Sequence, residues 1–151
     1  MKQDEVRRVI HGKRILALDP GMKRTGIAMT DPLHITVSPV AVIEMNDEAV
    51  SAILRIAIEH GVGAVIVGIP ERTIPSAMTL FAEEFAQTLE QAIVKHNTDI
   101  AVLRYDESFS TRHAFQAMSH IGMKKKKRQE KGQKDVISAC VILRNFLEEF
   151  Q

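Results

Sequence analysis

The sequence predicts an α/β domain built on one mixed five-stranded sheet with helices on both faces. Two observations support this fold class. Two apolar segments, 14–18 and 25–30, are separated by a Pro-Gly turn that is too short for a parallel crossover, so they predict an antiparallel hairpin. Two further apolar segments, 63–70 and 99–106, each follow a helical repeat of apolar residues. This alternation of strands and helices indicates right-handed parallel crossovers.

After the hairpin, the chain is expected to form one more strand and then a helix, because the spacing of its apolar residues changes from a strand pattern to a helical one. Segment 34–40 alternates weakly between apolar and polar residues, so we expect it to form the third strand of the antiparallel meander. Pro39 lies near the end of this strand, where a missing N–H donor is tolerated. A helix is expected to begin at Asn46 or Asp47, which are good capping residues, and to end at Gly61.

Three more helices complete the predicted order. Pro75 and Ser76 favour the start of a helix between the two parallel strands. A short helix is expected over 110–122, and a closing helix over 135–150 places Cys140 on its apolar stripe. The expected order is therefore three strands, then helix, strand, helix and strand, and finally two helices.

Length and composition indicate a single domain, residues 1–151. Hydrophobic residues make up 45% of the chain, and no apolar run reaches the roughly 18 residues of a membrane span. The charged N-terminus lacks the apolar core of a signal peptide, and the single cysteine excludes an internal disulfide. These features predict a cytoplasmic protein that makes no membrane contact.

Segment 123–134 concentrates positive charge, although the net charge of the chain is only +1. We expect it to be a mobile basic loop on a mildly acidic body, and such a loop favours a polyanionic partner. A basic segment alone is more often a solvated loop than a binding site. Its cations are Lys124, Lys125, Lys126, Lys127, Arg128, Lys131 and Lys134.

Four acidic residues are expected to converge at one edge of the sheet. Asp19 ends the first strand, Asp106 and Glu107 end the last strand, and Asp135 opens the closing helix. The carboxyl ends of strands are where sites form in such sheets, and we expect the first and last strands to lie close together. Taken singly, Asp19 suits a turn, Asp106 and Glu107 suit caps for the helix that follows, and Asp135 suits the start of a helix. Taken together, they predict a site for Mg²⁺ or Mn²⁺ that acts on a phosphodiester.

Four motifs, in order, carry a resemblance to the YqgF/RuvX family. They are "LDPGMKRTGIAMTDP", "VIVGIP", "DESFST" and "KDVISACVIL". The resemblance covers the chain from about Arg14 to Phe150. It implies an RNase H-like fold related to the RuvC Holliday-junction resolvases. It also implies a metal-dependent nuclease that matures pre-16S rRNA in ribosome biogenesis or resolves Holliday junctions.

By position in these motifs, Asp19, Glu107 and Asp135 match the family's catalytic acidic set, with Asp106 as an alternative ligand. Lys23 and Arg24 match a basic pair that would contact phosphate, and Ser110 and Thr111 match a hydroxyl pair that suits a helix cap. The chain departs from the family pattern at Met22 before the basic pair, at Ser108 in place of an arginine, and at Glu71, a spare carboxylate after the second motif.

The sequence leaves rival functions open. The same basic surface would serve a nucleic-acid-binding module without catalysis, and a metal titration would distinguish the two. A phosphotransfer enzyme of the actin and sugar-kinase type also has an Asp-containing hairpin, but it needs a second domain that 151 residues do not supply. The expected partner is pre-rRNA or branched DNA, with ribosomal particles as further candidates. The chain is expected to be a monomer or, if it resolves junctions, a homodimer.

Overall fold

The computed structural model describes residues 2–70, 76–107 and 133–150. Its elements are α1 (Gln3–Ile10), β1 (Arg14–Asp19), β2 (Arg24–Thr30), β3 (Val37–Glu44), α2 (Ala49–Glu59), β4 (Val62–Pro70), α3 (Ala77–Lys95), β5 (Ala101–Glu107) and α6 (Gln133–Phe150). The five strands form one sheet in the order β3-β2-β1-β4-β5. The β1, β2 and β3 pairings are antiparallel, whereas β4 pairs in parallel with β1 and β5. The predicted mixed sheet is therefore confirmed.

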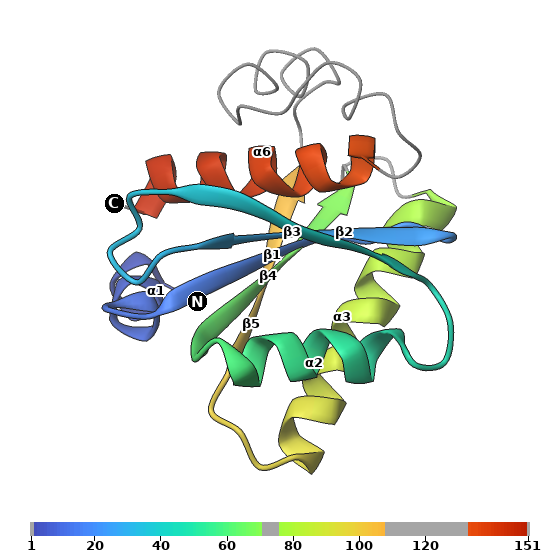
Figure 1. Ribbon diagram of the computed structural model, residues 1–151, viewed down its shortest axis with the longest axis horizontal. Helices are drawn as coiled ribbons and strands as arrows, with labels where there is room; N and C mark the ends of the chain where they lie inside the picture. The colour runs from blue at the N-terminus through green and yellow to red at the C-terminus, as the bar shows by residue number, and fades with distance from the viewer. Residues whose placement is uncertain (1, 71–75, 108–132, 151) are drawn as a thin grey trace.

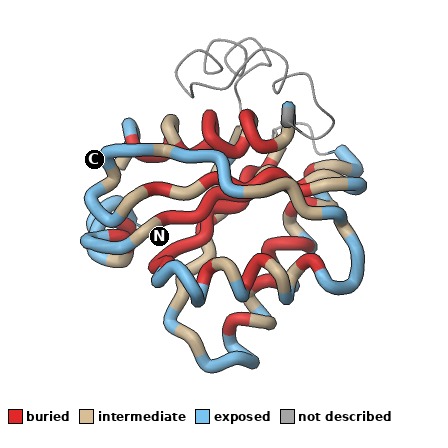
Figure 2. The backbone as a smooth tube through the Cα atoms, viewed as in Figure 1, coloured by how far each residue is buried: buried red, intermediate tan, exposed pale blue. Residues whose placement is uncertain are grey.

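Helices cover both faces of this sheet, as predicted (Figure 1). Helices α2 and α3 lie on one face and α6 lies on the other. Because side chains alternate along a strand, each central strand contributes to both cores. Leu16 and Leu18 of β1 pack in the core under α2 and α3, whereas Ile15 and Ala17 pack in the core under α6. Figure 2 shows the resulting band of buried backbone through the middle of the molecule.

The third strand differs from its predicted position, because β3 begins at Val37 and the expected segment was 34–40. The Asp31 carboxylate holds the preceding residues in a turn by accepting hydrogen bonds from the backbone N–H groups of Leu33, Ile35 and Thr36 at 3.1, 2.7 and 2.7 Å. These donors are thus not available to a strand ladder. Pro39 lies within β3, at the edge of the sheet, where its missing donor is tolerated.

The start of α2 was predicted too early: the helix begins at Ala49, after Glu48, and not at Asn46 or Asp47. Asn46 Oδ1 instead accepts a hydrogen bond from the Glu48 backbone N–H at 2.9 Å, within the turn before the helix. The other helix ends follow their sequence signals more closely. Helix α3 begins after Ser76, whose hydroxyl accepts a hydrogen bond from the Thr79 backbone in a capping box. After α2, Gly61 adopts a positive φ of 65°, which glycine tolerates without strain. The structure also contains α1, which was not predicted from the sequence, and Val6 and Ile10 anchor it in the core under α6. The predicted helix over 110–122 lies outside the described residues.

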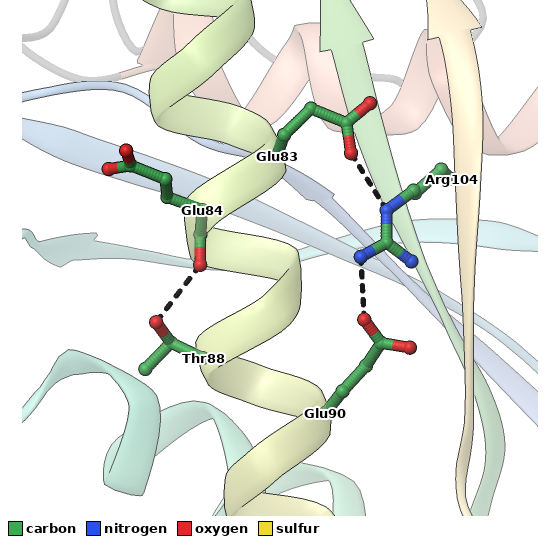
Figure 3. A network of polar contacts seen from close by, with 5 residues as sticks. All are labelled: Glu83, Glu84, Thr88, Glu90 and Arg104. Atoms are coloured by element: carbon green, nitrogen blue, oxygen red, sulfur yellow. Dashed lines mark hydrogen bonds and ion pairs between the residues drawn. The ribbon is translucent and has the colours of Figure 1, made fainter.

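A charged network fastens α3 to the edge strand β5 (Figure 3). The Arg104 guanidinium donates hydrogen bonds to Glu83 Oε2 at 2.8 Å and to Glu90 Oε1 at 2.5 Å. Both hydrogen bonds raise the pKa of Arg104 above its ordinary value, with the one to Glu90 contributing most. The network holds β5 in place two residues before its acidic end begins.

Candidate active site

Three carboxylates from three separate elements lie on the face of the sheet that α6 covers. Asp19 is the last residue of β1, Glu107 is the last residue of β5, and Asp135 lies in the first turn of α6. Asp19 follows Ile15 and Ala17 at even spacing, and both of those residues pack under α6. Glu107 stands in the same relation to Leu103 and Tyr105. Strand alternation thus aims Asp19 and Glu107 toward the helix that carries Asp135.

The electrostatics of these residues follow from burial and from their closeness to one another. Burial raises the pKa of Asp19 well above its ordinary value, and the charges of Glu107 and Asp135 raise it further. A hydrogen bond from Ser138 of α6 lowers this pKa in part. Burial, with a smaller contribution from the charge of Asp106, raises the pKa of Glu107 to about 7. The site therefore holds carboxylates that oppose one another's ionisation.

Asp106 lies apart from this group although it is adjacent to Glu107 in sequence. It is exposed, and alternation along β5 places it on the same face as Val102 and Arg104. That face packs against α3 and not against α6. Asp106 affects Glu107 through its charge, whereas the structure brings Asp19, Glu107 and Asp135 together.

The route by which Glu107 reaches Asp19 differs from the sequence expectation. Strands β1 and β5 are not neighbours, because β4 lies between them. The side chain of Glu107 instead extends over β4, where its carboxylate lies next to Gly68. The two acidic strand ends thus meet across an intervening strand.

The structure describes only part of the predicted basic surface. Arg24 lies beside the acidic group, with its Nε 3.7 Å from Asp135 Oδ2. That Nε is buried and has no hydrogen-bond partner among the described residues. Lys23 and Lys134 are both exposed, near the beginnings of β2 and α6. The other predicted residues lie outside the described ranges, namely Glu71, Ser108, Ser110, Thr111, Lys124, Lys125, Lys126, Lys127, Arg128 and Lys131.

Sequence reasoning missed the role of Gly26 beside these carboxylates. Gly26 pairs with Asp19 across β1 and β2. A Cβ atom at Gly26 would overlap the backbone oxygen of Asp135 and would lie 2.6 Å from the backbone nitrogen of Val136. The missing side chain therefore lets the first turn of α6 rest directly on the sheet beside Asp19. A glycine inside a strand was the available signal, since it often marks a close approach of another backbone.

The donor set of the three carboxylates suits a hard divalent cation. In the described ranges no three Asp, Glu, His or Cys side chains already form a group that would hold a metal ion. The three carboxylates nevertheless supply oxygen ligands only, which is what Mg²⁺ and Mn²⁺ prefer. A divalent cation among them would also favour the ionised forms that burial and mutual repulsion disfavour. The residues therefore fit such a cation.

Sequence comparison places the chain among known proteins. The sequence pattern of the RuvX family, described as "Holliday junction resolvase", matches residues 13–149. A protein of Chlorobium luteolum named "Putative pre-16S rRNA nuclease" is 38% identical over 141 residues, covering 90% of this chain and 94% of its own. A protein of Parabacteroides distasonis with the same name is 39% identical over 137 residues, covering 89% of this chain and 94% of its own.

Solved structures share the fold at low sequence identity. Thermus thermophilus RuvC superposes with a TM-score of 0.60 at 10% identity, covering 90% of this chain and 96% of its own. The fowlpox virus Holliday junction resolvase superposes with a TM-score of 0.57 at 12% identity, covering 90% of this chain and 99% of its own. The chain therefore has a RuvC-like, RNase H-like fold. None of the helices in the described part of the chain is long and apolar enough to span a membrane.

Proposed function

Because the chain belongs to the RuvX family, we propose that it is a divalent-metal-dependent endonuclease that hydrolyses phosphodiester bonds in pre-16S rRNA. The names of the relatives support a nuclease, and the substrate in those names supports pre-16S rRNA as the substrate here. The observation that carries the proposal is the gathering of Asp19, Glu107 and Asp135 on one face. Asp19 and Glu107 are held where burial opposes their charge. A fold seldom retains such a group unless a cation or a reaction uses it.

In the proposed site, Asp19, Glu107 and Asp135 would hold Mg²⁺ or Mn²⁺. Such an ion supplies an activated water and stabilises charge on the phosphate oxygens. Asp19, at the centre, is fixed by the sheet on one side and by Ser138 on the other. Burial raises the pKa of Glu107 to about 7 in the metal-free protein, and a bound cation would favour its ionised form.

Cationic residues around this centre would bind the RNA backbone. Arg24 Nε forms an ion pair with Asp135 Oδ2 at 3.7 Å, and the partly exposed Arg24 side chain would offer its other N–H groups to a phosphate oxygen. Lys23 and Lys134 are exposed near the same edge and add positive charge. We propose that the cations of the basic segment 123–134 also bind the phosphates of a structured RNA.

A cleavage assay tests the proposal with a matched pair of variants. Purified wild type, Asp19→Asn and Asp99→Asn proteins are incubated with a pre-16S rRNA fragment and either Mg²⁺, Mn²⁺ or EDTA. Asp99 is exposed and precedes the end of β5 opposite to Glu107, so its variant controls for the loss of one carboxylate. We expect Asp19→Asn to cut at least about a hundredfold more slowly while binding RNA normally. RNA binding without metal-dependent cleavage by the wild type would instead support a non-catalytic binding module.

A four-way DNA junction is the second candidate substrate. The description of the matching family and the fold shared with RuvC favour it. The same assay with a junction in place of the RNA separates the two candidates. Paired cuts in opposite strands, together with a dimer in solution, would favour a resolvase, because a symmetric junction requires two related sites.

A further inference from the structure

Two glycines flank Asp19 in neighbouring strands. Gly26 of β2 pairs directly with Asp19 of β1. On the other side, Leu18 is in register with Val67 of β4, so Gly68 follows at the level of Asp19. Both glycines lie on the face that α6 covers, because Ala28 and Ile66, each two residues away, pack in that core. Asp19 is thus the only side chain in a row of three positions across the sheet.

The space above Gly68 is filled by the carboxylate of Glu107. A Cβ atom at position 68 would lie 2.9 Å from Glu107 Oε2 and 3.1 Å from its Cδ. It would also lie 2.6 Å from Cδ1 of Ile142 on α6. Glu107 itself is in register with Pro70, two residues farther along β4. Its side chain therefore leans back along β4 and places its charged end over the glycine.

From this geometry we propose that Gly68 is a positioning residue for the active site. By lacking a side chain, it provides the seat in which the Glu107 carboxylate crosses β4 and comes to lie beside Asp19. Any side chain at this position would occupy the seat and turn the carboxylate away. Gly26 likewise leaves room for the backbone of Asp135. Glu107 and Asp135 are thus each positioned beside Asp19 by a glycine in a neighbouring strand.

A methyl group at position 68 has two separable effects. Its contact with Ile142 concerns packing, and shortening that side chain to valine removes the Cδ1 atom involved. Its contact with Glu107 concerns the site, and the valine does not relieve it. The double variant Gly68→Ala/Ile142→Val therefore isolates the displaced carboxylate from the core clash.

Gly63 offers a matched control within the same strand. A Cβ atom there would lie 2.6 Å from Cδ of Lys13, a contact as short as that with Ile142. Lys13 is exposed and lies at the opposite end of the strand from Pro70. Gly63→Ala thus repeats the glycine-to-alanine change in β4 without touching the carboxylates.

The experiment measures Mn²⁺ binding by calorimetry to metal-free protein, in the absence of nucleic acid, together with melting temperatures. We expect Gly68→Ala/Ile142→Val to melt close to Ile142→Val alone but to bind Mn²⁺ roughly 10- to 100-fold more weakly, the usual cost of losing support for a metal ligand. Gly63→Ala and Ile142→Val should bind Mn²⁺ like the wild type. Wild-type affinity in the double variant would overturn the proposal. If the double variant does not fold, Gly68→Ala/Ile142→Ala replaces it, because the alanine clears more of the space.

Crystal structures of the metal-free wild type and double variant complete the test. Displacement of the Glu107 carboxylate from its place over position 68 supports the role of Gly68, and an unmoved carboxylate overturns it. The metal-binding readout rests on the proposed function, whereas the crystal structures do not. A wild type that binds no Mn²⁺ would therefore count against the proposed function, and the structures alone would then decide the role of the glycine.

Discussion

The raised pKa of Glu107 predicts that the metal-free protein loses stability as the pH rises through neutrality. Burial, with a smaller contribution from the charge of Asp106, raises the pKa of this carboxyl from its ordinary value of 4.5 to about 7. Between these two values the folded protein binds a proton that the unfolded chain has released. Stability therefore falls with rising pH, because it falls wherever the folded state binds more protons than the unfolded state. Asp19, whose pKa is also raised, acts in the same direction.

The magnitude for Glu107 follows from the two pKa values. A carboxyl with a pKa of about 7 in the folded protein and 4.5 in the unfolded chain changes the free energy of unfolding by at most about 2.5 kcal/mol between pH 5 and pH 8. For a chain of this length, each kcal/mol shifts the melting temperature by about 2–4 °C. The Glu107→Gln variant should lose this part of the pH dependence and be more stable than the wild type at pH 8. The part due to Asp19 should remain.

Urea unfolding in EDTA, followed by circular dichroism from pH 5 to pH 8, measures the effect. Glu59→Gln, at the exposed end of α2, controls for the loss of one carboxylate elsewhere. A wild-type protein that keeps or gains stability between pH 5 and pH 8 would refute the reasoning. So would a Glu107→Gln variant with an unchanged pH profile. Mn²⁺ added at pH 8 should restore stability to the wild type, because a cation that binds the folded protein stabilises the buried ionised carboxylates.

Three further predictions follow from other contacts. Arg104→Met should lower the free energy of unfolding by about 1–2 kcal/mol in a urea titration, because it removes the hydrogen bonds that Arg104 donates to Glu83 and Glu90. An equal loss of stability in Arg104→Lys would contradict a role for two separate hydrogen bonds. Asp31→Asn should melt below the wild type at pH 7. Because hydrogen bonding lowers the pKa of Asp31, the two melting curves should converge as the pH falls below 3.8, and a constant difference would contradict this cause. Gly26→Ala should cost about 1–3 kcal/mol in urea unfolding by pushing α6 off the sheet, and wild-type stability would show that the helix can shift freely.

The sheet could be predicted well because its central strands are buried on both faces. The continuous apolar runs of β1 and β4 contribute to two cores at once, and an uninterrupted run of this length is typical of such a strand. The start of β3 was predicted too early. The reason is local, because the Asp31 side chain takes up backbone donors that would otherwise begin the strand. Hydropathy does not report such side-chain competition for the backbone.

The grouping of the acidic residues was predicted better than its geometry. Position at strand ends indicated that Asp19 and Glu107 would lie near Asp135, and the structure places all three on the face under α6. Strand order was beyond the reach of the sequence, since β4 lies between the two acidic strands. The spacing of apolar residues also does not reveal that Gly68 leaves room for the Glu107 side chain to extend over β4. The metal-binding and catalytic roles of these residues remain predictions.

The position of α6 at the end of the chain affects the order in which the protein folds during synthesis. All five strands precede this helix, so the sheet and the core under α2 and α3 can form while α6 is still being translated. At that stage Asp19 and Glu107 are present, but Asp135 is not. The acidic group of Asp19, Glu107 and Asp135 is therefore completed last. The same order leaves the apolar face that carries Ile15, Ala17 and Ile66 uncovered until the helix arrives, so this face is where a chaperone would be needed.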